Sequence, residues 1–382
     1  MFLLAKCGKN HYNQAESTGN TPARFRLGLG TGAPAREAHS MEKRKTQRVT
    51  LAKVAERAGV AESTASRVIN GYTHNFRVRP EVRQRVLDAA EALNYRPNPM
   101  VRSISAKKTN LVAVVGWASD GVNRTALSEA VRVLREADKH VCTTFLDPDY
   151  SGHELPSWRV DGAVALQVRD TTDLNELEEQ SMPYVSINGL AGPGGDAVNF
   201  NERHGMDQAI DHLLELGHTK IAYAYIDTKR LNPRGIPHTS VKERKDAYVS
   251  ILEHRGLKPV AGYDQFDHNA MSYCKMVLQQ GGATAVIAYD DITALYLIQA
   301  MNTLGMSVPR DMSIVAFNDE LPAKVATPPL TTIALPAAVA GKTAGELLLS
   351  RLAAEETIPS RTVTLDENLI IRQSTAAPRV TE

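Results

Sequence analysis

The chain has 382 residues, with 44 Lys and Arg against 43 Asp and Glu and a formal net charge of +1 at pH 7. This length predicts two or three domains, and the near-zero total charge does not by itself indicate nucleic acid. The three cysteines, Cys7, Cys142 and Cys274, are scattered and show no CxxC or Cys/His spacing. We therefore expect neither a disulfide framework nor a zinc site. This cysteine pattern fits a reducing cytoplasm, which is the location that we expect. No apolar run in the sequence is long enough to span a membrane.

Residues 1–46 are rich in Gly, Ala, Thr, Asn and Arg and show no hydrophobic periodicity, which predicts a disordered N-terminal extension. The apolar start MFLLA is too short for the core of a signal peptide. Met41 is followed by a basic run and then by the first patterned segment. We therefore hypothesise that the natural chain starts at Met41, which mass spectrometry of the natural protein would test.

Helical periodicity begins after Thr50, which stands at an N-cap position. Apolar residues recur at helical spacing over 51–58, Gly59 supplies a sharp turn, and a second helix is predicted over about 62–70. Small polar residues open that second helix. This pattern is typical of a helix-turn-helix, whose second helix can enter a DNA major groove. The alternative is an ordinary helical hairpin with a solvated polar face.

A third helix and a local excess of basic residues favour DNA binding. Pro80 suits the first position of a helix over 80–93, and Val82, Val86, Ala89 and Leu93 share one face. Residues 47–110 contain twelve Lys or Arg against five Asp or Glu. A basic module of this kind on a near-neutral body is expected to neutralise phosphates.

The run VTLAKVAERAGV…STASRVING…VRQRVLDAAEALNYRPN, within residues 49–98, resembles the DNA-binding headpiece of the LacI/GalR family of transcriptional regulators. The resemblance continues through HLLELGHTKIA, ERKDAY, AYDDITAL, VPRDMSIVAFND and TPPLTTI. It implies a helix-turn-helix domain over 47–97, a hinge helix or linker over 98–109, and an effector-binding and dimerisation core over 110–382.

The hinge is expected to fold only on DNA, because a two-turn helix is too short to be stable alone in water. Asn98 can cap it, and Ile104 occupies the position from which the family wedges an aliphatic side chain into the minor groove. An insertion relative to the family lies over 71–79. Its Arg77 and Arg79 belong to a solvated loop or add a phosphate contact.

From residue 111 strands alternate with helices, which predicts a doubly wound α/β core. The predicted strands are 111–115, 141–145, 162–166, 184–187, 221–225, 285–288 and 313–317. The predicted helices are 125–137, 174–180, 203–216, 240–254, 270–280, 292–304 and 337–354. Two such units resemble the periplasmic-binding-protein-like fold, two lobes around a cleft, with the chain crossing between lobes near 199–200, 317–318 and 335–336. The first lobe departs from the family pattern after its first strand, at 117–122.

Within the headpiece, the resemblance places Glu62, Ser63 and Arg67 at base-facing positions. The Arg67 guanidinium matches guanine O6 and N7, whereas Glu62 either accepts from cytosine N4 or is simply solvated. Thr64, Ser66 and Asn70 are better placed for phosphate oxygens. The complete set of predicted DNA-binding residues is Thr50, Glu62, Ser63, Thr64, Ser66, Arg67, Asn70, Asn98 and Ile104.

In the core, the resemblance assigns effector contacts to Arg244, Asp291, Asn188 and His268. Arg244 would clamp hydroxyl groups or a carboxylate bidentately, and Asp291 follows a buried strand at the edge where ligands bind in open α/β folds. Asn188 would reach the cleft from the first lobe, and His268 lies where the family often stacks an aromatic ring on a sugar. A surface or capping role is the alternative for each.

We predict no catalytic residues, no metal and no cofactor, since GxSxG, HExxH, Walker and GxGxxG patterns are all missing from the sequence. The predicted function is a sequence-specific transcriptional regulator, most often a repressor in this family. It would bind near-palindromic operator DNA as a homodimer under the control of a sugar or sugar acid. Helices near 125–137 and 207–216, together with the later first-lobe crossover, are expected at the dimer seam, and the sequence does not decide among them. The alternative is a sugar-binding receptor or an α/β enzyme with an accessory helical domain.

Overall fold

The computed structural model describes residues 49–70, 78–96, 108–116, 118, 120–143, 155–224, 236–261 and 269–379. The predictions for the extension 1–46, for Asn98 and Ile104 in the hinge, and for His268 lie outside the described residues. Residues 71–77 of the insertion also lie outside the described residues. Among the described helices, none combines the length and the apolar character that crossing a membrane requires.

Three helices form the headpiece around a small apolar core: α1 (Leu51–Ala58), α2 (Glu62–Asn70) and α3 (Pro80–Ala92). The Thr50 hydroxyl caps α1 by accepting a hydrogen bond from the Lys53 amide at 3.5 Å. Gly59 ends α1 in the left-handed region, at φ 64°, where a residue without a Cβ is not strained. Val54, Ala65 and Val86, one from each helix, are fully buried.

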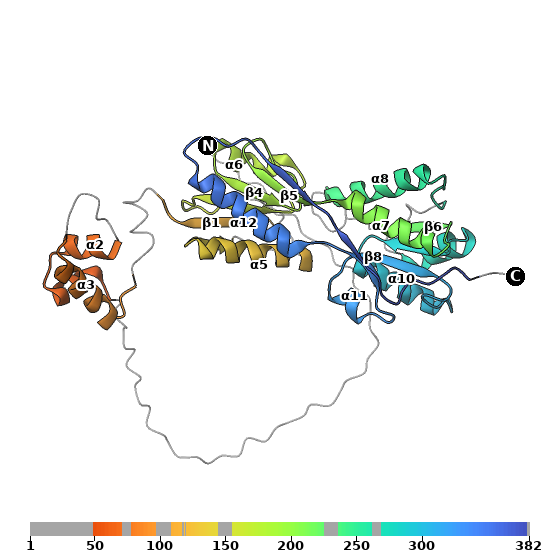
Figure 1. Ribbon diagram of the computed structural model, residues 1–382, viewed down its shortest axis with the longest axis horizontal. Coiled ribbons are helices and arrows are strands. Elements are labelled where there is room, and N and C mark those ends of the chain that lie inside the picture. Colours follow the sequence, from red (N-terminus) through yellow and green to blue (C-terminus); the bar gives the residue numbers. More distant parts are fainter. Residues whose placement is uncertain are drawn as a thin grey trace, which may run out of the picture.

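The body contains two sheets of mainly parallel strands, each covered on both faces (Figure 1). The first-lobe sheet has the order β10-β5-β4-β3-β1-β2, and its strands are β1 (Leu111–Gly116), β2 (His140–Thr143), β3 (Gly162–Leu166), β4 (Tyr184–Ile187), β5 (Asp196–Phe200) and β10 (Thr362–Leu365). Helices α5 (Gly121–Glu136) and α12 (Ala337–Ala353) lie side by side on one face, and the short α6 (Asn175–Glu179) covers the other. Continuous apolar strands such as LVAVVG are buried because of this double cover.

The second-lobe sheet has the order β11-β9-β8-β7-β6. Its strands are β6 (Ile221–Ala224), β7 (Ala285–Ala288), β8 (Ser313–Asn318), β9 (Thr331–Ala334) and the antiparallel β11 (Asn368–Ile370). Helices α7 (Glu202–Glu215) and α8 (Thr239–His254) pack on one face. The other face is covered by α9 (Ala270–Tyr273), the π-helix η3 (Cys274–Gln280), α10 (Asp291–Thr303) and α11 (Leu321–Val325).

The chain passes between the two sheets after β5, between β9 and α12, and between β10 and β11. The last passage, at 366–367, corrects the prediction of a crossing near 317–318. That prediction is wrong because β8 is followed by α11 and β9, which both stay in the second lobe. The first strand–helix turn also differs, since α5 begins at Gly121 where the sequence predicted a start at 125.

Candidate functional site

The polar face of α2 lies opposite its buried residues. Ala65 and Val68 face the headpiece core, whereas Glu62 and Ser63 are exposed and Arg67 is half-buried. The Asn70 amide donates to the Ser66 hydroxyl at 3.1 Å, which fixes two half-buried polar side chains one turn apart. The helix therefore presents a carboxylate, hydroxyls, an amide and a guanidinium on one side, the groups that contact base edges and phosphates in DNA.

A cavity of about 180 Å³ lies between the two lobes of the body. The first lobe contributes side chains that follow the carboxyl ends of its strands, among them Asp120, Gln167, Arg169 and Asn188. The second lobe contributes Glu202, His238, Ser240, Arg244, Tyr289, Asp290 and Asn318. Ligands of open α/β sheets bind at this edge of the strands, so the position as well as the lining indicates a small-molecule site.

His238 joins the lobes at the wall of this cavity. Its Nε2 lies 2.7 Å from the backbone oxygen of Asn188 in the first lobe, and its Nδ1 lies 2.8 Å from the Ser240 hydroxyl. Burial lowers the pKa of His238, so the ring is neutral at neutral pH. Because a carbonyl can only accept, Nε2 carries the proton and donates, and Nδ1 accepts. The Ser240 hydroxyl continues the chain to the Tyr289 hydroxyl at 2.7 Å.

Arg244 is buried at the second-lobe side of the cavity and is held there by contacts with the protein. Its Nε donates to Glu202 at 2.5 Å and a terminal nitrogen donates to the Tyr289 backbone oxygen. Its guanidinium also lies 4.2 Å from the centre of the Phe317 ring. Burial opposes the charge, but Glu202 and neighbouring groups outweigh it and hold the pKa of Arg244 above its ordinary value.

Glu367, on the passage between β10 and β11, lies next to this ion pair. It is fully buried and neither carboxyl oxygen has a hydrogen-bond partner among the described residues. Burial and the nearby Glu202 carboxylate raise the pKa of Glu367 well above its ordinary value. The Arg244 guanidinium and the Glu202 carboxylate line the cavity, and Glu367 lies beside this pair.

Glu320 provides a second contact between the lobes. Its Oε1 accepts from the backbone amides of Gly121 at 2.8 Å and Val122 at 3.1 Å, at the N-terminus of α5. A carboxylate is stabilised there by the free amides and the helix dipole. The Glu320 amide in turn donates to Asp291 at 2.7 Å, so the first turn of α10 is tied through Glu320 to the first lobe.

Two family models match the chain. The model of bacterial regulatory proteins of the lacI family matches residues 50–98, and that of a periplasmic binding protein-like domain matches residues 210–375. A similar relative is the HTH-type transcriptional repressor PurR of Mannheimia succiniciproducens, 29% identical over 338 residues that cover 85% of this chain and 98% of the relative. The chain carries a lacI-family DNA-binding domain and a periplasmic binding protein-like domain.

Two solved structures show the same architecture. The lac repressor dimer bound to operator and the anti-inducer ONPF has a TM-score of 0.72 at 23% identity, covering 87% of this chain and all of the other. The complex of the transcriptional regulator CelR with cellobiose has a TM-score of 0.58 at 26% identity, covering 86% of this chain and all of the other. A helix-turn-helix headpiece on a two-lobed periplasmic-binding-protein-like body is therefore confirmed, and the chain is a transcriptional regulator.

The inter-lobe cavity brings together two of the residues predicted to bind an effector, Arg244 and Asn188. Asp291 is not among the side chains that line this cavity, so its assignment to the effector stays a prediction. Its two carboxyl oxygens instead accept from the Glu320 amide and the Thr332 hydroxyl inside the second lobe. The carboxylate at the cavity belongs to Asp290, which also caps α10 by accepting from the Thr293 amide at 2.7 Å.

Several lining residues were not predicted from the sequence. Gln167 and Arg169 follow a buried strand, and the signal that could have found them is the polar pair directly after GAVAL. Asp120 was passed over because 117–122 departs from the family pattern, although Asp before a helical pattern indicates an N-cap. His238 and Glu202 gave no sequence signal, since they reach the cavity from positions next to helix starts.

Proposed function

We propose that this regulator binds operator DNA through α2 and is controlled by a small hydroxylated metabolite in the inter-lobe cavity. The observation that carries the proposal is the presence, in one chain, of a headpiece with a polar α2 face and a polar cavity whose wall is formed by both lobes. In support, relatives include a repressor named PurR, and the solved neighbours include one bound to operator and one bound to cellobiose. The domain limits at 47, 98 and 110 belong to this proposal.

Within α2 we assign base recognition to Arg67, Glu62 and Ser63. A guanidinium donates bidentately to guanine, and each such pair contributes about 1–3 kcal/mol of discrimination. Thr50, Thr64, Ser66 and Asn70 contact phosphates, which set the orientation of the headpiece but not the sequence preference. Asn98 and Ile104 extend the contact into the hinge.

The charges of the cavity favour an uncharged sugar over a sugar acid. Its lining holds three carboxylates, on Asp120, Glu202 and Asp290, against the guanidinium groups of Arg169 and Arg244. Arg244 is paired with Glu202, so a ligand carboxylate would meet a net acidic wall. A volume of about 180 Å³ is below the roughly 300–1,000 Å³ of drug-sized sites, which favours a monosaccharide.

We assign control to the contacts that join the lobes around the cavity. The His238–Asn188, Glu320–Gly121 and Arg169–Ile236 hydrogen bonds all cross from one lobe to the other. A ligand that interacts differently with the joined and the separated lobes shifts their populations, and this would alter the spacing of two hinges in a dimer.

The dimer seam is assigned to an apolar surface, here called the α10–α12 patch: Ile292, Tyr296, Leu321, Val325 and Val339, which are 45–69% exposed. These side chains lie on α10, α11 and the first turn of α12 (Figure 1). The exposed large apolar side chains of the described chain include none from the helices expected at the seam, 125–137 and 207–216. A cluster of exposed apolar side chains marks an interaction surface. We therefore assign the dimer seam to the α10–α12 patch in place of helices 125–137 and 207–216.

The test begins with selection of duplexes from a random pool by the full chain, followed by binding titrations at several salt concentrations. Arg67→Ala is expected to weaken binding to the selected duplex about 5- to 150-fold and to reduce the sequence preference at one base pair. The control Lys258→Ala, on the exposed surface of the body, should leave the affinity unchanged. If the full chain prefers no duplex over the pool, the proposal fails. If Arg67→Ala leaves both affinity and profile intact, the assignment of α2 fails.

The effector is tested by thermal-shift measurements with a panel of neutral sugars and sugar acids. Asp290→Asn removes the charge but keeps an N-cap oxygen, so a smaller shift from the best ligand reports a lost contact rather than a damaged helix. Asp246→Asn, on the exposed side of α8, is the matched control. A sugar acid that stabilises more than every neutral sugar would refute the charge argument.

A further inference from the structure

A second and larger cavity, here called the basic cavity, lies at the opposite edge of the first-lobe sheet. Its volume is about 550 Å³. Lys108, Lys139, Arg159 and Pro183 line it from the segments that precede β1 to β4, and Arg351 lines it from the last turn of α12. The inter-lobe cavity lies beyond the carboxyl ends of the same strands, so the two cavities are separated by the length of the sheet.

The charge of the basic cavity suits a dianion. Its described lining has four cations, Lys108, Lys139, Arg159 and Arg351, and one acid, Asp161, which is taken up by the backbone amides of 109 and 110 and by the Thr109 hydroxyl. The C-termini of α5 and α12 also point to this edge, and each adds about half a negative charge. The sum is roughly two positive charges, which matches the charge of a phosphate monoester at pH 7.

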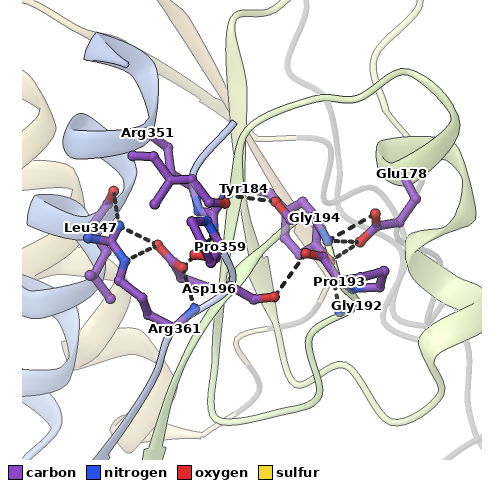
Figure 2. Close-up of polar contacts among 12 residues, drawn as sticks. Glu178, Tyr184, Gly192, Pro193, Gly194, Asp196, Leu347, Arg351, Pro359 and Arg361 are labelled. Carbon is purple, nitrogen blue, oxygen red and sulfur yellow. Dashed lines mark hydrogen bonds and ion pairs between the residues drawn. The ribbon is translucent and has the colours of Figure 1, made fainter. Parts of the chain in front are cut away.

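The base of the basic cavity is formed by a buried side chain that hydrogen bonds hold in one position. Arg351 is only 8% exposed, and it donates to Asp196 at 2.6 Å and to the backbone oxygens of Gly194, Ile358 and Pro359 (Figure 2). Its Nε has no hydrogen-bond partner among the described residues. Arg361 donates to the other Asp196 oxygen, so one buried carboxylate fixes both guanidinium groups.

Lys139 is also held in place, because its Nζ donates to the Asn110 side-chain oxygen at 2.8 Å. A lysine fixed by a neutral amide keeps its positive charge and two further N–H donors for a ligand. Arg351 contributes positive charge at this cavity but no donor, because its terminal N–H groups are given to Asp196 and to backbone oxygens and its Nε is buried. The donors come from the lysines, and a tetrahedral oxyanion can accept charge-assisted hydrogen bonds from Lys139 and Lys108.

An adjoining cavity of about 310 Å³ argues against a polyanion such as DNA. It shares Arg351 and Pro183 with the basic cavity but carries Glu178, Glu355 and Glu356. A nucleic-acid backbone lying across both cavities would place phosphates beside these acids. A small ligand would instead place its phosphate in the basic cavity and its hydroxyl groups over the acidic one.

We propose that the basic cavity binds the phosphate group of a small phosphorylated metabolite, as a second ligand site distinct from the inter-lobe cavity. Lys108 is the first described residue after the segment that joins the headpiece, so an occupant is in direct contact with the end of that segment. The α10–α12 patch reaches α12 at Val339, about 18 Å along the helix from Arg351, so dimerisation through that patch leaves the basic cavity accessible. Binding at this site does not depend on the proposed operator or sugar.

The test is a calorimetric and ³¹P NMR titration of the full chain with inorganic phosphate and with glycerol 2-phosphate, at fixed ionic strength. The double variant Lys108→Gln/Lys139→Gln is expected to lose at least about tenfold in affinity, since each charge-assisted contact contributes on the order of tenfold. The matched control Lys258→Gln/Lys275→Gln makes the same change of charge on the exposed surface of the second lobe and should bind as the unmodified chain does. Both variants keep Arg351, so the network around Asp196 is preserved.

Three results would overturn the proposal. The first is no saturable binding of either phosphate compound by the unmodified chain. The second is an equal loss of affinity in the control variant, which would indicate general screening. The third is a double variant that binds phosphate normally but shows a salt dependence of duplex binding reduced by about two phosphate contacts, which would assign these lysines to DNA. Failure to bind any duplex, in contrast, would refute the proposed function and leave this site standing.

Discussion

The buried carboxyl group of Asp291 makes a specific prediction about stability and pH. Burial, with a contribution from Asp290 and Glu320, raises the pKa of Asp291 to about 7, against an ordinary value near 3.8. Between about pH 4 and pH 7 the unfolded chain loses this proton while the folded chain keeps it, so the free energy of unfolding falls as pH rises. At 1.36 kcal/mol per unit of pKa, the loss approaches about 4 kcal/mol at pH 7 and then levels off.

Asp291→Asn should remove this loss without disturbing the local geometry. An Asn oxygen can accept from the Glu320 amide and its nitrogen can donate to the Thr332 hydroxyl, so both hydrogen bonds survive. Urea unfolding of the full chain, followed by circular dichroism, should show the variant more stable than the unmodified chain by about 2–4 kcal/mol at pH 8, with little difference at pH 4. Exposed Asp138→Asn is the matched control. A stability difference that stays the same at both pH values would refute the reasoning.

Three other predictions concern how the lobes are built. Glu367→Gln should raise the melting temperature more at about pH 8 than at about pH 5, because the raised pKa of Glu367 makes the folded chain hold a proton that the unfolded chain has lost. Gly341→Ala should lower the free energy of unfolding by about 1–3 kcal/mol, because the added Cβ would lie 1.9 Å from the Ala126 backbone oxygen and force α5 and α12 apart. Thermal unfolding measures this loss, and Ser350→Ala is the control. Glu320→Gln should weaken the link to Gly121 by about 0.5–2 kcal/mol and increase the radius of gyration of the ligand-free chain in small-angle scattering.

The fold could be predicted from the sequence wherever one element carries its own signal. The headpiece helices have a capping Thr50, a turn at Gly59 and Pro80 at a first helical position, and each feature acts within one or two turns of chain. The strands LVAVVG and GAVAL were equally clear, because strands buried on both faces need unbroken apolar runs.

Other strands were missed because their neighbours define them. In β9, TTIA, the two threonines are fully buried even though they are polar, and in β10 and β11 exposed residues alternate with half-buried ones. β10 pairs with β5, which lies more than a hundred residues earlier in the chain. β9 pairs with β8, and β11 pairs with β9, so each of these strands is defined by the strand beside it and not by its own residue pattern. The same fact explains the misplaced crossing, since only the pairing of β10 and β11 with different sheets shows that the chain changes lobe at 366–367.

The position of a single helix boundary decides which of the adjacent Asp290 and Asp291 faces the cavity. The sequence pattern placed the start of the helix at Ile292, which would make Asp291 the N-cap and turn its carboxylate toward the edge of the sheet. In the structure α10 begins at Asp291, so Asp290 adopts the extended N-cap conformation, with φ −149° and ψ 176°, and faces the cavity. Asp291, as the first helical residue, is rotated into the interior and held by Glu320 and Thr332. Helix ends are uncertain by one or two residues in any sequence pattern, and successive residues there point in different directions. Which of two adjacent aspartates meets a ligand is therefore decided by tertiary packing, and only the aspartate at the cavity, Asp290, should affect ligand affinity through its charge.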